Sequence, residues 1–323
     1  MSVKKKCFPS LNAGCYEYPE GELNTLKNEN IIVKNEFDIN SNDNALFVTA
    51  QCNNHCLMCC QPPRKVDDIE VLYEHNIQLL RSAPKELKVL GITGGEPTLL
   101  GEKLITLLQE IRKYLPDTAI QLLSNGRAFR DASFTREVSQ AAGENFFVGI
   151  PFHSDYSGDH DLIAGSKHAY EETMTGLYNL ADAGVEIELR VVINKLNYIR
   201  LPRMAEYIFK NLPFVAWTAF MGMERTGLSV RNAEKIWVEP KEYAPLLREA
   251  VIAMDDWRMD VAIYNVPLCL LSRDIWPFAK QSISDWKTKY IECCGTCAAK
   301  EQCCGHFSTS TQTYEGINPI TEL

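Results

Sequence analysis

Three cysteines in one short loop are the strongest chemical signal in this sequence. Cys52, Cys56 and Cys59 stand in the run 50–59, Ala-Gln-Cys-Asn-Asn-His-Cys-Leu-Met-Cys, which is short enough to wrap around one metal group. Soft thiolate ligands suit iron-sulfur clusters. A 4Fe-4S cluster held by three cysteines keeps one iron without a protein ligand, and that iron can bind a cofactor or substrate through nitrogen and oxygen. The spacing therefore predicts a 4Fe-4S cluster with one open iron.

A zinc ion is the alternative at this loop. Structural zinc sites use four tetrahedral protein ligands, and the fourth would have to be His55 or Cys60. Cys60 is a poor fourth ligand because it directly follows Cys59, so its side chain tends to point away from the same metal. We interpret Cys60 as a spare buried thiol.

The secondary structure that positions this loop follows the polar N-terminal residues. There, an apolar run of β type alternates six times with a stretch of helical period. Apolar runs rich in Val, Ile, Leu or Phe predict strands at 45–50, 87–93, 119–123, 146–152, 186–193 and 216–221. Apolar spacing of i, i+3, i+4 predicts helices at 67–81, 102–115, 170–183 and 201–211. This alternation is typical of an α/β fold with a parallel sheet, here a partial (β/α)6 TIM-like barrel. Active-site residues of such barrels lie at the C-terminal ends of the strands, where the cysteine loop follows the first strand.

Composition divides the rest of the chain into modules. We expect an N-terminal arm over 1–44, the barrel over 45–257 and a cysteine-rich C-terminal module over 258–323, with a helix at 241–257 before the boundary and an apolar run at 259–266 after it. Lys4, Lys5 and Lys6 are not followed by the apolar run of a signal peptide. Nowhere do about 18 consecutive apolar residues occur. The sequence predicts a soluble, cytoplasmic protein.

Charge and cysteine content narrow the function classes further. Against 33 Lys and Arg stand 42 Asp and Glu, which gives a formal net charge of −9, so non-specific binding to nucleic acid or to an anionic membrane is not expected. Cytosolic thiols stay reduced. The 12 cysteines therefore indicate metal ligands rather than disulfides.

A second group of cysteines lies in the C-terminal module. Cys269, Cys294, Cys297 and Cys303 could fully enclose a second, auxiliary 4Fe-4S cluster, which would have no open iron and would serve electron transfer or structure. Zinc is the competitor. The adjacent residues Cys293 and Cys304 could replace Cys294 and Cys303 with no change visible in the sequence.

The cysteine loop after the first strand, together with Gly94-Gly95-Glu96-Pro97-Thr98 after the second, resembles the radical S-adenosylmethionine (SAM) superfamily. The resemblance implies that SAM binds the open iron by its amino and carboxylate groups. One electron, from a donor such as flavodoxin or ferredoxin, then yields a 5'-deoxyadenosyl radical that removes a hydrogen atom from the substrate. We expect SAM and the 4Fe-4S cluster as cofactors.

Residues after the successive strands are candidates for holding SAM. Gly94 and Gly95 lack side chains, so backbone can come close to a ligand there, and Glu96 can accept hydrogen bonds from an ammonium group. Gly-Gly-Glu alone is more often a plain turn, but its place after the second strand, next to Pro97, favours the SAM site. The family binds the ribose where this chain has Ser124, Asn125 and Ser154.

Arg190 and Met58 are two further candidates for binding SAM. Arg190 lies inside the fifth strand and needs a partner if buried, either a SAM carboxylate or an ion pair with Glu188 or Glu224. Met58 stands where the family usually has an aromatic residue, and its thioether could pack on adenine. The sequence identifies no catalytic acid or base.

A closer resemblance covers 44–307 and looks like the His-Xaa-Ser system radical SAM maturases (HxsC type). It rests on 52–63, 93–101, 123–129, 276–279, 282–287 and the tail cysteines, whose spacing resembles a twitch or SPASM-like auxiliary module of peptide-modifying enzymes. Cys60, Cys304 and His306 depart from the pattern. The resemblance implies a ribosomally made peptide with His-Xaa-Ser repeats and a second radical SAM protein as partners. The rivals are a radical SAM enzyme acting on a small metabolite or RNA, and a non-catalytic metal-binding partner of a maturase.

Overall fold

The structure, a computed structural model, describes residues 7–8, 16–17, 37–40, 44–281 and 287–322. Most of the expected N-terminal arm lies outside these residues, and so does 282–286; in the arm, β1 (Cys7–Phe8) pairs antiparallel with β2 (Tyr16–Glu17). Internal contacts divide the chain into two units. The first comprises 1–53, 63–149 and 172–186, and the second comprises 54–62, 150–171 and 187–323.

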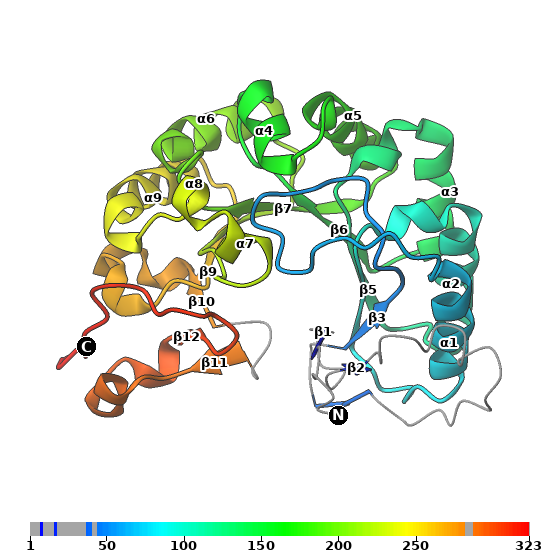
Figure 1. Cartoon of the computed structure of the whole chain (residues 1–323). Helices are drawn as coiled ribbons and strands as arrows, with labels where there is room; N and C mark the ends of the chain where they lie inside the picture. The colour runs from blue at the N-terminus through cyan, green and yellow to red at the C-terminus, as the bar shows by residue number, and fades with distance from the viewer. Residues whose placement is uncertain (1–6, 9–15, 18–36, 41–43, 282–286, 323) are drawn as a thin grey trace. The chain divides into compact units, whose positions relative to one another are not determined.

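The first unit is built on parallel strands with helices along one side. Its strands follow one another in space as in the sequence: β3 (Ala45–Phe47), β4 (Val89–Thr93), β5 (Ala119–Leu123) and the start of β6 (Phe146–Pro151). Leu46 pairs with Ile92, and Leu122 pairs with Val148; all four are fully buried, as expected for strands covered on both faces. The helices are α1 (Ile69–Arg81), α2 (Glu102–Tyr114), α3 (Ala132–Ala142) and α5 (Ala169–Asp182), and the first three lie side by side (Figure 1).

The second unit repeats this design and extends it. Strands β7 (Glu186–Val192), β8 (Trp217–Met221), β9 (Val261–Tyr264) and β10 (Ala279–Lys280) are parallel neighbours in that order. The helices are α4 (Ser157–Ala164), α6 (Leu201–Asn211), α7 (Leu228–Arg231), α8 (Ala233–Ile236) and α9 (Pro240–Asp256).

The prediction of six strands in the sheet is correct for β3 to β8, but the sheet also contains β9 and β10. The run 259–266, which we assigned to the C-terminal module, contains β9, and β9 pairs parallel with β8. Helix α9 connects the two strands, and a helical crossover brings the next strand parallel to the last. The chain therefore has an α/β fold with eight parallel strands, four associated with each unit.

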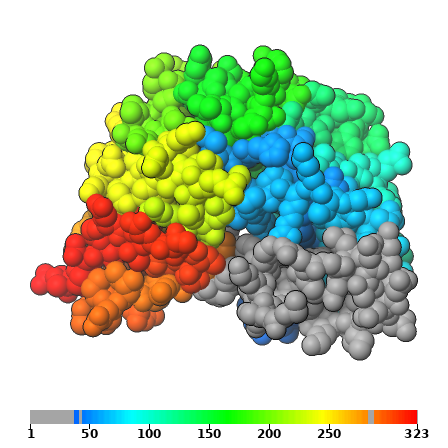
Figure 2. Space-filling view, viewed as in Figure 1, coloured from blue at the N-terminus to red at the C-terminus, as the bar shows by residue number. Residues whose placement is uncertain are grey.

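The C-terminal cysteine-rich segment contains little regular structure. Short 3-10 turns at Leu268–Leu270, Arg273–Phe278, Glu292–Thr296 and Lys300–Gln302 alternate with β11 (Thr288–Lys289) and β12 (His306–Phe307), which pair antiparallel. The last residues, red in Figure 2, cover the orange segment that precedes them. In the part of the chain that the structure describes, no helix is long and apolar enough to cross a membrane.

Candidate metal and cofactor sites

The first unit holds the start of the cysteine loop by two buried anchors. The carboxylate of Asp68, just before α1, accepts hydrogen bonds from the Thr49 hydroxyl and the Ala50 N–H, both at 2.7 Å. The Gln51 carbonyl accepts the Glu96 N–H at 2.8 Å. Half-buried Cys52 follows directly. The sequence did not point to Asp68, because an aspartate just before a helix is usually explained as an exposed N-terminal cap of that helix.

Gly94 and Gly95 allow a close approach, but to the chain's own backbone. A Cβ on Gly94 would lie 2.5 Å from the Thr49 carbonyl oxygen, and one on Gly95 would lie 2.1 Å from the Gln51 carbonyl oxygen. The Gly95 N–H donates to the Thr49 carbonyl at 2.7 Å. We expected these glycines to let the backbone approach a ligand. They also allow the cysteine loop to pack directly against the turn after β4.

Replacing Gly95 by alanine is expected to destabilise the first unit by about 1–3 kcal/mol, because the new methyl group overlaps backbone that cannot move aside. Urea denaturation of the wild type and the variant measures the loss. Gly184→Ala is the matched control: its φ is +73° but nothing lies within 4 Å of the added Cβ, so it loses only the smaller cost of a left-handed alanine. Equal losses in the two variants would contradict the packing argument.

Glu96 lies fully buried at the centre of a hydrogen-bond network after β4. Its Oε1 accepts the Thr98 N–H at 3.0 Å and the hydroxyls of Thr98 and Ser124, both at 2.7 Å; its Oε2 accepts the Asn125 N–H at 2.7 Å. Burial raises the pKa of Glu96, and these four hydrogen bonds oppose the rise. A carboxylate oxygen has two lone pairs, so Oε2 retains acceptor capacity for an ammonium group.

Ser124 and Asn125 also bind protein groups. The Ser124 hydroxyl donates to Glu96, and the Asn125 side-chain amide donates to Asn53 Oδ1 at 2.6 Å. Arg127 donates to the Asn53 carbonyl at 2.9 Å and forms an ion pair with Glu172. Hydrogen bonds thus link Glu96, Ser124 and Asn125 and add Asn53 beside Cys52, while the role of these residues in binding SAM stays a prediction. No spacing in the sequence pointed to Asn53.

The second unit holds the rest of the cysteine loop by its backbone. The N–H groups of His55 and Leu57 donate to the carbonyls of Ala164 and Ile163 at 3.0 and 2.9 Å, and the Cys59 carbonyl accepts the Leu228 N–H at 2.9 Å. Two glycines permit this contact: a Cβ on Gly165 would lie 2.2 Å from the His55 carbonyl oxygen, and one on Gly227 2.6 Å from those of Cys59 and Cys60. Cys56 and Cys59 are half-buried.

Met58, predicted to pack on adenine, is buried in an apolar cluster with Ile163, Met223 and Ile236. Its neighbours in that cluster include Cys56 and Leu57. Met58 therefore anchors the loop in the core.

Ser154 and Arg190 lie at strands β6 and β7. The Ser154 hydroxyl is fully buried and accepts the Tyr156 N–H at 3.2 Å. Arg190 has the ion-pair partner proposed as its alternative, since its Nε lies 3.7 Å from Glu188 Oε1. That distance is too long for a hydrogen bond, and among the described residues the buried Nε has no hydrogen-bond partner.

Cys60 is exposed to solvent and lies close to charged groups. Desolvation by the surrounding protein raises the pKa of its thiol, Glu224 adds to the rise, and Lys287 and Arg190 oppose it. The prediction of a buried Cys60 thiol is therefore wrong.

Two buried histidines follow β6. His160 Nδ1 accepts the His153 backbone N–H at 3.3 Å, and the two rings lie 5.0 Å apart. Neither ring nitrogen of His153 has a hydrogen-bond partner among the described residues. Burial lowers the pKa of His160 to about 4, and burial together with His160 lowers the pKa of His153. Both rings are therefore neutral at pH 7.

This neutrality predicts acid sensitivity. An unfolded histidine binds a proton near pH 6.5, whereas folded His160 does so near pH 4, so its contribution to stability is present above pH 6.5 and is lost as the pH falls toward 4. Between pH 7.5 and 5.5 the free energy of unfolding should fall by about 1 kcal/mol through His160. Urea denaturation at both pH values should show a smaller fall in His160→Gln. The control His168→Gln, whose side chain is 73% exposed, should match the wild type; an unchanged fall in His160→Gln would contradict the assignment.

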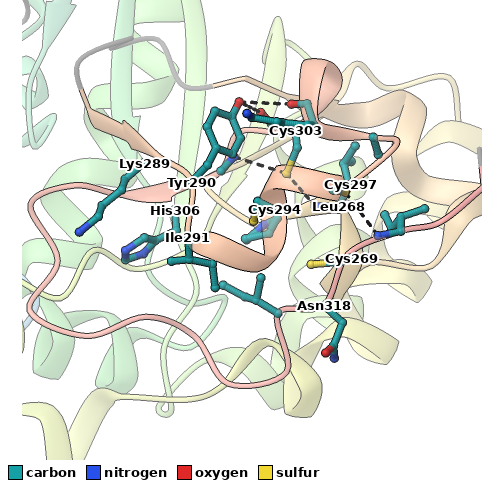
Figure 3. A pocket seen from close by; sticks show the side chains of 16 residues that line it. Leu268, Cys269, Lys289, Tyr290, Ile291, Cys294, Cys297, Cys303, His306 and Asn318 are labelled. Atoms are coloured by element: carbon teal, nitrogen blue, oxygen red, sulfur yellow. Dashed lines mark hydrogen bonds between the residues drawn. The ribbon is translucent and has the colours of Figure 1, made fainter.

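The four cysteines predicted to hold the auxiliary cluster line one pocket of the second unit. Cys269, Cys294, Cys297 and Cys303 border it together with His306 (Figure 3). Its empty volume, including the opening to solvent, is about 410 Å³. Cys293 and Cys304 do not line it, which favours the predicted set over the alternatives that the sequence allowed.

Backbone amides point at three of these sulfur atoms. The N–H groups of Leu268 and Gly305 donate to Cys303 Sγ, and the Ile320 N–H donates to Cys297 Sγ, each at 3.4 Å. A backbone hydrogen bond from Asn318 reaches Cys269. Hydrogen bonds to the sulfurs are a feature of iron-sulfur sites, so the pocket fits such a cluster.

The thiols differ in acidity. A hydrogen bond from the Cys304 thiol, supported by those from Leu268 and Gly305, lowers the pKa of Cys303 to about 6. Burial raises the pKa of Cys269 and Cys294. Among the described residues no three His, Cys, Asp or Glu side chains converge closely enough for a single metal ion. The four thiols border a shared pocket instead.

Comparison with known sequences adds independent evidence. The sequence pattern of the radical SAM superfamily matches residues 46–208, half of the chain. Fe-coproporphyrin III synthase of Methanosarcina barkeri (strain Fusaro / DSM 804) is 23% identical over 167 residues, which cover 50% of this chain and 39% of that protein.

Solved structures with a similar fold include two with SAM bound. Streptococcus suis SuiB bound to S-adenosylmethionine superposes with a TM-score of 0.55 at 15% identity, covering 68% of this chain and 49% of SuiB. Native anSMEcpe with bound AdoMet and Kp18Cys peptide gives a TM-score of 0.53 at 19% identity, covering 67% and 62%. The chain spans less than two thirds of the length of each of these relatives, and at these identities the likeness shows the fold. The match over 46–208, which includes the cysteine loop after β3 and the Gly-Gly-Glu turn after β4, shows that the chain belongs to the radical SAM superfamily.

Proposed function

We propose that this protein cleaves SAM reductively to a 5'-deoxyadenosyl radical and uses the radical to modify a ribosomally made peptide of the His-Xaa-Ser type. The observation that carries the proposal is the three-cysteine loop, held by backbone hydrogen bonds after the first barrel strand of a radical SAM family member. A 4Fe-4S cluster on Cys52, Cys56 and Cys59 would supply the electron and the open iron.

The residues around the loop fit SAM in two respects. Among the described residues Glu96 Oε2 accepts one hydrogen bond, from the Asn125 N–H, and can take another from an ammonium group. Arg190 Nε is a buried donor without a hydrogen-bond partner among the described residues. We assign SAM binding to the predicted set: in the first unit Gly94, Gly95, Glu96, Pro97, Ser124 and Asn125, and in the second Met58, Ser154 and Arg190.

A peptide substrate is supported by the relatives and by the auxiliary pocket. SuiB has been solved with its precursor peptide SuiA, and anSMEcpe with peptides. The resemblance to His-Xaa-Ser maturases narrows the substrate to peptides with such triplets and adds a second radical SAM protein as partner. We also assign flavodoxin or ferredoxin as the electron donor to the cluster on the cysteine loop. Cys52 of this loop borders an open hollow lined by Arg64 and Lys65, where such a donor could approach.

The test is to incubate anaerobically reconstituted protein with SAM, dithionite and a synthetic peptide containing His-Xaa-Ser triplets, and to record 5'-deoxyadenosine and the peptide mass. The proposal expects both products, with the mass change lost when the triplet His and Ser are replaced by alanine. Formation of 5'-deoxyadenosine with no change in any peptide, but with a changed metabolite or RNA, would favour the rival substrate classes. Metal binding without SAM cleavage or a SAM-induced change in the cluster's EPR signal would favour the non-catalytic partner.

A further inference from the structure

The loop after β8, residues 222–228, contacts the cysteine loop within the second unit. The Leu228 N–H donates to the Cys59 carbonyl at 2.9 Å. Met223 is buried in the apolar cluster of the cysteine loop, and Cys56 packs against the same cluster. The position of the loop after β8 therefore affects where Cys56 and Cys59, two of the three proposed cluster ligands, are held.

A segment near the C-terminus, residues 309–315, binds the loop after β8 through its backbone. We call this segment the C-terminal strap. The Thr311 N–H donates to the Arg225 carbonyl, and the Arg225 N–H donates to the Ser310 hydroxyl, both at 3.0 Å. Both backbone polar groups of Arg225 are thus bound by the strap.

Tyr314 is the strap residue that reaches the apolar cluster of the cysteine loop. Its side chain is buried, and its hydroxyl donates to the Met223 carbonyl at 3.1 Å and lies 3.4 Å from the Asn265 carbonyl. Its ring stacks on Trp237, with 5.7 Å between the ring centroids. Trp237 packs against the cluster that contains Met223 and Met58. Tyr314 therefore supports this cluster through both its hydroxyl and its ring.

We propose that Tyr314 is a positioning residue for the cluster on the cysteine loop: it holds the loop after β8, and that loop holds Cys59 as a ligand. This inference rests on the proposed function, which places a 4Fe-4S cluster on Cys52, Cys56 and Cys59. A thiolate can leave a cluster when its backbone opens locally, and the population of the open form depends on the contacts that must break. The strap therefore protects the cluster that cleaves SAM, although its neighbours in the sequence line the auxiliary pocket.

Tyr290 provides a matched control in the same C-terminal segment. Its hydroxyl, like that of Tyr314, donates to two backbone carbonyls, that of Cys303 at 3.0 Å and that of Lys300 at 3.2 Å. Neither carbonyl belongs to the loop after β8. Tyr290→Phe therefore removes the same atom as Tyr314→Phe but leaves the support of the cysteine loop intact.

A second variant, Thr309→Val, tests the strap at its other end. The Thr309 hydroxyl donates to the carboxylate of Glu224, which belongs to the loop after β8. Valine keeps the branched shape of threonine but has no hydroxyl to donate, so this change weakens the strap without touching Tyr314.

The experiment uses the full-length protein, reconstituted anaerobically with iron and sulfide, as the wild type and as these three variants. Each sample is incubated with the chelator EDTA, and portions taken at intervals are reduced with dithionite and mixed with SAM. We would record the amplitude of the EPR signal that changes when SAM is added, because a cluster needs an open iron to respond in this way. Urea denaturation gives the global stability of each protein.

Tyr314→Phe should lose the SAM-responsive signal roughly fivefold faster than the wild type, as expected for one lost hydrogen bond that opposes local opening. Thr309→Val should also lose the signal faster, and Tyr290→Phe should match the wild type. A merely structural role of Tyr314 would instead lower the urea stability of both tyrosine variants and leave their rates of signal loss equal.

Equal rates of signal loss in Tyr314→Phe and Tyr290→Phe would overturn this inference and leave the proposed function standing. A wild type that holds iron and sulfide but gives no SAM-responsive signal would overturn the proposed function, and this inference with it. If Tyr314→Phe does not fold, the rate in Thr309→Val decides: a rate equal to that of Tyr290→Phe overturns the inference, and a faster one supports it.

Discussion

Replacing Cys52, Cys56 and Cys59 together by alanine is expected to abolish dithionite-dependent formation of 5'-deoxyadenosine from SAM. Each thiolate would hold one iron of the cluster, and without the cluster neither the electron nor the open iron reaches SAM. Anaerobic incubation followed by chromatography measures the product. Iron content, measured in the same samples, should fall by about four per chain.

The matched control is Cys60→Ala, one residue beyond the loop. Cys60 is exposed beside Glu224 and Lys287 and is assigned no ligand role, so this variant should retain its iron and its 5'-deoxyadenosine. Loss of iron in Cys60→Ala would show that Cys60 is a fourth ligand, as in a closed zinc or iron-sulfur site. Activity that persists in the triple variant would sink the radical SAM mechanism.

The fold was predictable where the signal is local. Each strand from β3 to β8 is a short apolar run, and the helices α1, α2, α5 and α6 have a clear apolar period, so their positions follow from residues that are neighbours in the sequence. Helices α3 and α4 were not predicted. The strands β9 and β10 were missed because 259–266 is followed by cysteines, and the change in composition suggested a module boundary where the sheet continues.

The candidate sites likewise contain residues that the sequence could predict and residues that it could not. Cys269, Cys294, Cys297 and Cys303 have a readable spacing, and the structure places all four around one pocket. The choice of Cys303 over Cys304 was not readable, because it depends on which thiol the backbone at Gly305 turns toward the pocket. Asp68 and Asn53 were missed because their roles arise from contacts with residues 18 or more positions away in the sequence.

Replacing Cys294 and Cys297 together by alanine is expected to remove the auxiliary cluster while 5'-deoxyadenosine formation in the absence of peptide continues. The two thiols belong to one short turn, Glu292–Thr296 and the residue after it, and both line the pocket. A cluster left with Cys269 and Cys303 alone would have too few ligands to persist. Iron should fall from about eight to about four per chain.

This region should also lose stability with its metal. From Leu268 onward the described residues form only 3-10 turns and the two-residue strands β10, β11 and β12. Bonds to a cluster would therefore account for much of the order of this segment, and metal-binding energy is then folding energy. Limited proteolysis should cut the double variant within this segment faster than the wild type or Cys293→Ala. Loss of one zinc rather than four irons would identify a structural zinc site, and unchanged metal content would show that these thiols hold no metal.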